Sequence, residues 1–271
     1  MERSLALMCG AGRLPARMAE EARRQGWRVI AFVFEDAADI AGRVDRVVPA
    51  RITALGPVLS TLQETGASAA LFSGRFSMPE IVRTDRGAAD AVARGFEAQA
   101  GSRIDARLAD VVIGTLAGLG VEVLDQRQFL GEWRGAAGCW SARAPSEAEW
   151  ADVRRGLGVA RMIADARVGQ TVVVRHGAVV AVEAAEGTTE TIRRGGAVGG
   201  AGAVVVKAVA RDHDYRFDAP AVGPDTIRAA AEAGVTVVAL EAERVLLFDR
   251  PEAVQIADAA GIAVVGVDGP A

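Results

Sequence analysis

The chain has 271 residues, enough for about two domains, and its 51% hydrophobic and 24% charged residues are typical of a folded protein and exclude a disordered one. The formal net charge of −4 and the scattered arginines exclude the basic surface of a nucleic-acid-binding protein and a polybasic membrane patch. Two cysteines are too few for a disulfide framework, and no apolar stretch reaches the about 20 residues of a membrane span, so we expect a cytoplasmic protein.

The first half of the sequence alternates strand and helix patterns. Apolar runs predict strands at residues 4–9, 27–34, 69–73 and 121–124. Amphipathic segments predict helices at residues 14–25, 54–65, 88–100 and 104–119. Because strands that alternate with helices form parallel sheets with right-handed crossovers, we expect an α/β fold with a Rossmann-like N-terminal domain.

A stretch rich in glycine and alanine, without periodicity, interrupts this alternation at residues 131–145. Domain boundaries usually fall in such segments. We therefore divide the chain into an N-terminal domain of residues 1–132 and a C-terminal α/β domain of residues 133–271.

The C-terminal domain begins with clear helix and hairpin signals. Ser146 followed by Glu149 has the spacing of a capping box and predicts a long helix at residues 147–166. Two β-rich runs on either side of His176 and Gly177 predict a hairpin, because this pair is suited to positive φ angles. Further along we expect strands at 204–206 and 235–240, a helix that begins near Asp225 with Pro224 at its first position, and a final helix capped by Asp249 near Pro251.

The densest group of charge follows the apolar run at residues 204–206. It surrounds the single tyrosine, Tyr215, and consists of Arg211, Asp212, His213, Asp214, Arg216 and Asp218. A polar loop between a buried strand and a helix is where α/β proteins bind ligands, but a solvated turn with surface ion pairs has the same composition. Both interpretations stay open, and His213 likewise reads either as part of a metal-binding group or as a solvated loop residue.

A glycine turn, GAGRLP at residues 10–15, joins the first strand to the first helix. Backbone N–H groups in such a turn can bind a phosphate at the positive end of the helix, although the turn can also serve only to pack the helix on the sheet. Pro15 stands where a dinucleotide fingerprint requires its third glycine, and no Walker lysine follows. The turn therefore disfavours a nicotinamide cofactor and leaves another phosphate group open.

A second polar group follows the hairpin. The hydroxyls of Thr188 and Thr189 and the guanidinium groups of Arg193 and Arg194 are suited to hold a pyrophosphate, while the same pattern also fits a capped surface helix. A single carboxylate at a helix start, as at Asp105, is typical of a cap or a partner of the helix dipole.

The order of several segments resembles a known family. These segments are GAGRLP, FSGRF, GQTVVV, VEAAEGT, RRGG, VVVKA, RFDAP and GPDTI. They span nearly the whole chain, and the pair VEAAEGT and RFDAP is far more distinctive than a glycine turn alone. On these segments the sequence resembles the bacterial UDP-2,3-diacylglucosamine pyrophosphatases of the second, non-calcineurin type, a family of lipid A synthesis.

The resemblance implies both a fold and a reaction. The fold is a Rossmann-like N-terminal domain and a C-terminal domain peculiar to the family, with the substrate between them. The reaction is metal-dependent hydrolysis of the pyrophosphate of UDP-2,3-diacylglucosamine to UMP and 2,3-diacylglucosamine 1-phosphate, with Mg²⁺ or Mn²⁺ as cofactor. The resemblance also implies a homodimer that contacts the inner membrane peripherally.

Site residues follow from the same resemblance. Asp218 in RFDAP is implied to be the essential catalytic carboxylate and a metal ligand, with Asp105 and Asp214 as further metal ligands. The implied substrate-binding residues are Gly10, Gly12, Arg13, Leu14, Gly74, Thr188, Thr189, Lys207 and Arg216.

The sequence also departs from the family pattern. Thr189 stands where members usually carry aspartate, Ala106 replaces the second of two paired aspartates, His213 replaces a glutamine, and Ala11 replaces the middle glycine of the turn. Loss of two carboxylates removes ligands or bases from a site for Mg²⁺ and pyrophosphate. The alternatives are therefore a phosphohydrolase with another nucleotide-linked substrate and a non-catalytic homologue that binds a nucleotide-linked or lipid ligand.

Overall fold

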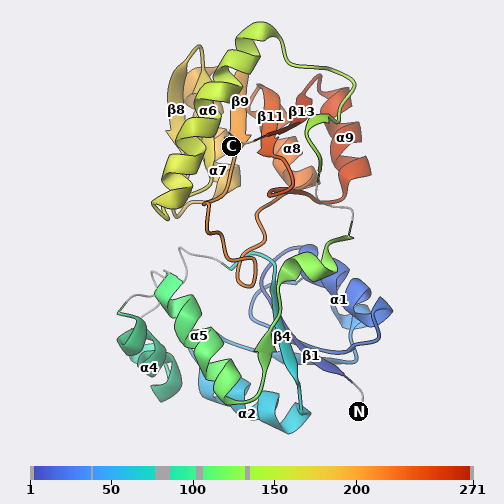
Figure 1. The fold of residues 1–271 in the computed structure, drawn as a ribbon, viewed down its shortest axis with the longest axis vertical. Helices are drawn as coiled ribbons and strands as arrows, with labels where there is room; N and C mark the ends of the chain where they lie inside the picture. Colours follow the sequence, from blue (N-terminus) through green and yellow to red (C-terminus); the bar gives the residue numbers. More distant parts are fainter. Residues whose placement is uncertain (1–2, 38, 77–85, 102–105, 132–134, 269–271) are drawn as a thin grey trace. The chain divides into compact units, whose positions relative to one another are not determined.

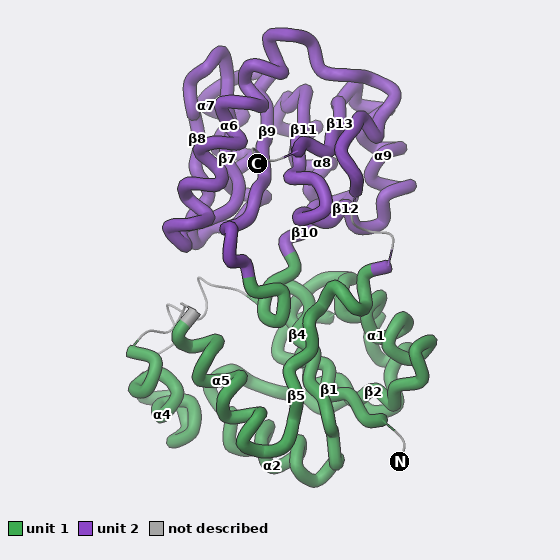
Figure 2. Tube along the Cα trace, in the orientation of Figure 1, with its two compact units in different colours: residues 1–130, 214–219 green, residues 131–213, 220–271 purple. Residues whose placement is uncertain are grey.

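The computed structural model describes residues 3–37, 39–76, 86–101, 106–131 and 135–268 (Figure 1). The chain forms two compact units. Unit 1 comprises residues 1–130 and 214–219, and unit 2 comprises residues 131–213 and 220–271 (Figure 2). The sequence places all of residues 133–271 in one domain, whereas the short segment 214–219 groups with the first unit.

Unit 1 contains a parallel sheet of Rossmann-like topology. Over the described residues, its strands lie in the order β3 (Arg46–Pro49), β2 (Arg28–Val33), β1 (Ser4–Cys9), β4 (Ala69–Ser73) and β5 (Glu122–Val123). The chain proceeds from β1 to β2 and β3 on one side, and β4 and β5 lie on the other side of β1. This reversal creates a topological switch point between β1 and β4, where α/β proteins bind ligands at the carboxyl ends of the strands.

Helices of unit 1 follow the predicted pattern. They are α1 (Leu14–Arg24), α2 (Leu55–Thr65), α4 (Ala91–Ala100) and α5 (Ala106–Gly118). Helix α4 begins later than predicted, because Asp90 is its N-cap and accepts a hydrogen bond from the backbone N–H of Ala93 at 2.8 Å. The α/β class and the Rossmann-like topology expected from the sequence are confirmed.

Unit 2 contains a mixed sheet. Over the described residues, its strands lie in the order β6 (Gly138–Cys139), β13 (Ala263–Val267), β11 (Val235–Glu241), β9 (Ala203–Lys207), β7 (Thr171–Arg175) and β8 (Ala178–Val182). Strands β9, β11 and β13 are parallel, whereas β6, β7 and β8 pair antiparallel to their neighbours. A separate parallel pair consists of β10 (Ala221–Val222) and β12 (Leu246–Leu247).

Helices cover both faces of this sheet. They are α6 (Glu147–Asp165), α7 (Thr188–Gly199), α8 (Pro224–Glu232) and α9 (Arg250–Ala259). Val204 and Val206 of β9 share a buried cluster with Leu157 of α6, while Val205 shares another with Ile192 of α7, as the alternation of side chains along a strand requires. No helix in the described parts of the chain combines the length and hydropathy needed to cross a membrane.

Two local predictions in unit 2 are confirmed. The Ser146 hydroxyl accepts from the backbone N–H of Glu149 at 3.4 Å, and the Glu149 carboxylate accepts from the Ser146 N–H at 2.8 Å, which completes the capping box. His176 and Gly177 have φ angles of 50° and 79° in the hairpin turn. The Asp152 carboxylate of α6 accepts hydrogen bonds from both turn N–H groups, at 2.9 and 2.6 Å, and so ties the hairpin to this helix.

Asp249 lies at the predicted N-cap position of α9, but the predicted capping by its side chain is wrong. Asp249 occupies the N-cap position, but its φ of 46° and ψ of 47° are left-handed, and its side chain makes no capping hydrogen bond. A capping side chain normally needs an extended backbone, which this residue does not have.

Candidate functional site

The glycine turn lies at the switch point of unit 1 and is bonded to the loop that follows β4. The N–H of Gly10 donates to Ser73 O at 2.8 Å, and Ala11 and Arg75 exchange two backbone bonds of 2.8 and 3.0 Å. The N–H of Gly12 donates to Asp36 O at 3.0 Å. All three N–H groups therefore donate to carbonyls of the protein and are not available to bind a phosphate.

Close approach of the two loops explains two of the glycines. A Cβ on Gly10 would lie 2.7 Å from the carbonyl carbon and oxygen of Arg75. Gly74 has a φ of 88°, and its Cβ would lie 2.8 Å from Gly10 O and from Pro15 Cγ. The structure thus brings the predicted residues Gly10 and Gly74 together, with loop packing as the physical reason for both.

The other predicted residues of the turn lie at the start of α1. Gly12 is exposed, with a φ of 98° and no atom within 4 Å of a built Cβ. Arg13 is the N-cap of α1, Leu14 is its first residue, and both are half-buried. Gly12 is thus the most exposed residue of the turn, while Ala11, Arg13 and Leu14 are half-buried.

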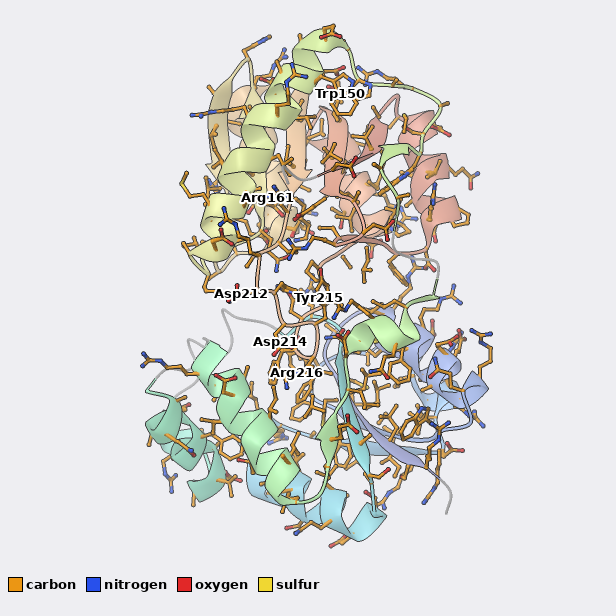
Figure 3. The ribbon with its side chains drawn as sticks, viewed as in Figure 1. Trp150, Arg161, Asp212, Asp214, Tyr215 and Arg216 are labelled. Carbon is orange, nitrogen blue, oxygen red and sulfur yellow. The ribbon has the colours of Figure 1, made fainter. Side chains whose placement is uncertain are left out.

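The segment Asp214–Ala219 packs on the same end of the unit 1 sheet; Figure 3 labels three of its residues. The ring of Phe217 stacks on that of Phe72 at the end of β4, with centroids 4.4 Å apart. The Tyr215 carbonyl accepts from the N–H of Gln126 at 3.1 Å, and the Arg127 guanidinium lies 4.3 Å from the centre of the Tyr215 ring. These contacts hold the segment beside β4 and β5.

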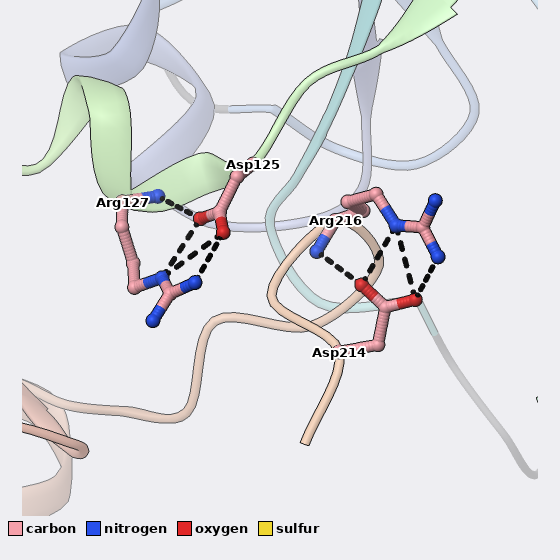
Figure 4. Close-up of polar contacts among 4 residues, drawn as sticks. All are labelled: Asp125, Arg127, Asp214 and Arg216. Atoms are coloured by element: carbon pink, nitrogen blue, oxygen red, sulfur yellow. Dashed lines mark hydrogen bonds and ion pairs between the residues drawn. The ribbon is translucent and has the colours of Figure 1, made fainter. Parts of the chain in front are cut away.

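Two aspartate–arginine pairs flank this contact, each between residues two apart in sequence (Figure 4). Asp214 accepts from the N–H, Nε and Nη2 of Arg216 at 2.7 to 3.1 Å. Asp125 makes the same set of bonds to Arg127 at 2.5 to 3.0 Å. Both oxygens of Asp214 therefore bind Arg216, and a metal ion would have to displace that guanidinium to use Asp214 as a ligand.

Charge within these pairs is stabilised by the geometry. The hydrogen bonds that Arg216 donates to the Asp214 carboxylate raise the pKa of Arg216. Burial acts to raise the pKa of Asp125, but the hydrogen bonds and charge of Arg127 outweigh it and lower that pKa. These shifts stabilise the charged forms of Arg216 and Asp125.

Asp218 follows the turn that begins at Asp214. The carbonyl of Asp214 accepts from the N–H groups of Phe217 and Asp218 at 3.3 and 3.5 Å, and the turn leaves Asp218 exposed. The predicted catalytic carboxylate is therefore accessible at the ligand-binding end of the unit 1 sheet, two residues from Arg216.

The predicted metal ligands do not form a complete site among the described residues. Asp105 lies outside the described residues. In the parts of the chain that are described, no three His, Cys, Asp or Glu side chains come together in a group that could hold an ion. The carboxylates near this turn are Asp218 and the arginine-bound Asp214 and Asp125. One or two protein carboxylates are enough for Mg²⁺ when water and substrate phosphates supply its other oxygen ligands, so these residues fit part of such a site.

A second cluster of predicted residues lies in unit 2, around the end of β9. Lys207 is 4% exposed. Its Nζ donates to the hydroxyls of Thr188 at 3.0 Å and Thr171 at 3.4 Å, and lies 3.8 Å from the Glu183 carboxylate. The ammonium is therefore buried among these acceptors, and Thr188 is the half-buried residue of the group.

Glu183 completes this cluster and is not among the site residues predicted from the sequence. It is 8% exposed, accepts from the Thr188 hydroxyl at 2.9 Å and accepts from the N–H of Gln170 at 3.2 Å. Burial acts to raise its pKa, but the charge of Lys207 and these hydrogen bonds outweigh burial and lower it. Glu183 and Lys207 thus form a buried ion pair. The signal in the sequence that could have identified Glu183 is its place directly after a β-branched strand, within VEAAEGT.

The start of α7 is the accessible side of this cluster. Gly187 is its N-cap, and no side chain caps the helix. Thr189 is half-buried at the second helical position, and its side chain makes no hydrogen bond within the described parts of the chain. Arg193 and Arg194 pair with Glu190 and Glu186, which agrees with the interpretation of these arginines as surface residues.

Fold and site together define a two-unit α/β protein, with an accessible carboxylate beside the ends of β4 and β5 of a Rossmann-like sheet. Residues 4–133 match the family model described as the LpxI N-terminal domain, and residues 136–265 match that described as the LpxI C-terminal domain. The chain therefore belongs to the LpxI family, and the resemblance found in the sequence is confirmed.

A relative supports this assignment over the full length of the chain. It is the UDP-2,3-diacylglucosamine pyrophosphatase LpxI of Caulobacter vibrioides, which is 31% identical over 281 residues and covers 98% of each chain. Among solved structures, glycinamide-RNase-transformylase T from Mycobacterium tuberculosis is 15% identical over 66% of this chain and 44% of its own, with a TM-score of 0.25. That likeness is too low to support any argument.

Proposed function

We propose that this protein hydrolyses the pyrophosphate bond of UDP-2,3-diacylglucosamine and releases UMP and 2,3-diacylglucosamine 1-phosphate. The observation that carries the proposal is the accessible Asp218 at the end of a docked turn, in a chain that aligns with a pyrophosphatase of this specificity over 98% of its length. In the reaction, the oxygen of a water bonds to one phosphorus and the bridging P–O bond breaks.

Asp218 and Arg216 have complementary roles in this proposal. The Asp218 carboxylate aligns the attacking water and accepts its proton. Asp214 binds Nε and Nη2 of Arg216, which orients the guanidinium so that Nη1 can donate to a phosphate oxygen. Arg216 then offsets negative charge that develops on the phosphate during bond cleavage.

Thr188 and Thr189 are proposed as substrate contacts through the start of α7. The buried pair of Lys207 and Glu183 fixes the Thr188 hydroxyl from both sides, since one donates to it and the other accepts from it. The backbone N–H groups of the first helical turn and the hydroxyl of Thr189 then remain for an anionic group of the substrate.

Dependence on Mg²⁺ or Mn²⁺ is part of the proposal because the resemblance implies it. Among the described residues, Asp218 and the arginine-bound Asp214 would contribute ligands for the ion, and no chemical step is assigned to it. We also propose, from the resemblance, a homodimer in the cytoplasm with peripheral contact to the inner membrane. Light scattering after size-exclusion chromatography measures the first, and sedimentation with anionic lipid vesicles measures the second.

The test is release of UMP from UDP-2,3-diacylglucosamine by the full chain, with Mg²⁺ or Mn²⁺, with EDTA, and with Asp218→Asn. A matched control is Asp212→Asn, in the same loop, where the carboxylate is 78% exposed and pairs with Arg167. We expect UMP from the wild type and from Asp212→Asn, and none with EDTA or from Asp218→Asn. Release by Asp218→Asn at the wild-type rate would contradict the role of Asp218.

A second candidate function is binding of the lipid nucleotide without hydrolysis. The engagement of both Asp214 oxygens by Arg216 and the presence of Thr189 in place of an aspartate favour it, because both lower the number of available carboxylates. Calorimetric titration with the same substrate distinguishes the two functions: heat of binding without any UMP supports the second and overturns the first.

A further inference from the structure

Gln126 is a buried polar residue between the unit 1 sheet and the turn that carries Asp218. It is the first residue of a short 3₁₀ helix, Gln126–Phe129, directly after β5, and it is 2% exposed. Burial of a side-chain amide lowers the stability of the fold unless its N–H and C=O groups form hydrogen bonds.

Its partners lie on two separate segments. The backbone N–H donates to Tyr215 O at 3.1 Å. With the side-chain amide oriented to suit its neighbours, Nε2 donates to Phe72 O at 3.2 Å and Oε1 accepts from the N–H of Asp218 at 3.3 Å. In the reverse orientation, Nε2 would face the Asp218 N–H, and Oε1 would face the Phe72 carbonyl oxygen. Neither pair could form a hydrogen bond, so these two neighbours determine the orientation of the amide.

The bond to Asp218 is the shorter of two that its N–H makes. The other is to Asp214 O at 3.5 Å, within the turn itself. Phe217, the preceding residue, stacks on Phe72, the same residue whose carbonyl accepts from Gln126. Ring stacking and the amide bridge therefore fix the backbone on both sides of the Phe217–Asp218 peptide against the end of β4.

We propose that Gln126 is a positioning residue, which holds the backbone of Asp218 in register with the end of β4 and so aims the exposed Asp218 carboxylate. This inference rests on the proposed function, in which Asp218 acts on the reacting water. Small errors in the placement of a reacting group lower the rate of the chemical step far more than they lower substrate binding.

Only a side chain with a donor and an acceptor at its tip can make this bridge. Methionine has nearly the length and volume of glutamine without either group, so Gln126→Met keeps the packing and leaves Asp218 N–H and Phe72 O unpaired. Gln128→Met is the matched control, because Gln128 lies in the same 3₁₀ helix and is exposed.

The experiment measures kcat and KM for UMP release, together with hydrogen exchange of the Asp218 amide, in the full chain. For Gln126→Met we expect kcat to fall about 10- to 100-fold while KM changes by less than about 2-fold, with both constants unchanged in Gln128→Met. The Asp218 amide should exchange faster in Gln126→Met.

Three results would overturn the inference. They are an unchanged kcat, a rise in KM as large as the fall in kcat, and an unchanged exchange rate of the Asp218 amide. Should the wild type release no UMP, the proposed function fails, and the amide exchange still decides the inference, since it reads the Asp218 backbone directly. Faster exchange would then support positioning by Gln126, and unchanged exchange would overturn it.

Discussion

Replacement of Lys207 by methionine tests the buried ion pair of unit 2. Lys207 is 4% and Glu183 is 8% exposed, so this change leaves a buried carboxylate without its cation. Breaking such a pair costs about 3 to 5 kcal/mol. Because folded domains are stable by only about 5 to 15 kcal/mol, we expect a clear fall in the unfolding midpoint of unit 2.

The stability lost in Lys207→Met should depend on pH, because Glu183 is titratable. In the wild type, burial acts to raise the pKa of Glu183, but Lys207 and the hydrogen bonds outweigh burial, and the pKa is lowered. Glu183 thus contributes stability above its unfolded pKa of about 4.3, and that contribution is lost as pH falls through the folded pKa. Without Lys207 burial dominates and raises the pKa, so the variant should recover stability relative to the wild type between about pH 7 and about pH 5.

Urea unfolding at several pH values, followed by hydrogen exchange of the β9 amides, measures the effect on unit 2 alone. The double variant Lys207→Met/Glu183→Gln removes both charges and should be more stable than Lys207→Met, because no unpaired buried charge remains. Equal losses in the single and double variants, or a loss in Lys207→Met that does not change with pH, would refute the reasoning.

Three other changes have defined outcomes. Glu149→Ala breaks the capping box and should lower the stability of unit 2 by about 1 kcal/mol. Burial acts to raise the pKa of Glu149, but its hydrogen bonds outweigh burial and lower that pKa from 4.5 to about 2. Glu149 therefore contributes stability above pH 4.5, and this contribution is lost as the pH falls toward about 2. The melting temperatures of variant and wild type should converge in acid. Gly74 has a φ of 88°, and a Cβ there would lie 2.8 Å from the Gly10 carbonyl oxygen, so Gly74→Ala should lower the melting temperature of unit 1. Gly114→Ala in α5 is the control, because a Cβ there meets no atom within 4 Å, and it should not lower the melting temperature. Equal melting temperatures of the two variants would contradict this. Asp214→Asn removes a charged acceptor from Arg216 and should raise KM for UMP release, and an unchanged KM would argue against the phosphate contact.

Much of the fold follows from local patterns. The strands at residues 4–9 and 69–73 have the predicted bounds, because continuous apolar runs between glycine turns have few alternative conformations. The capping box at Ser146 and the hairpin at His176 are likewise set by residues a few positions apart. By contrast, β3 at Arg46–Pro49 is not predicted, since it pairs at the sheet edge with little apolar pattern of its own.

The site depends more on tertiary contacts, which a single sequence does not contain. The charged loop is recognisable from composition, but its attachment to unit 1 depends on a stack between Phe217 and Phe72 and on Gln126, which are far apart in the chain. Lys207 is identified as a site residue only by resemblance, and its burial follows from a partner, Glu183, on another strand end. The geometry also changes the interpretation of Gly10, whose N–H is bonded to the protein itself.

The most direct test of the central claim is the reaction in ¹⁸O-labelled water, with both products analysed by mass spectrometry. Hydrolysis of the pyrophosphate by the wild type should place one ¹⁸O atom in either UMP or 2,3-diacylglucosamine 1-phosphate, and Asp218→Asn should form neither product. Absence of UMP from the wild type, or products without ¹⁸O, would contradict hydrolysis at the Asp218 site.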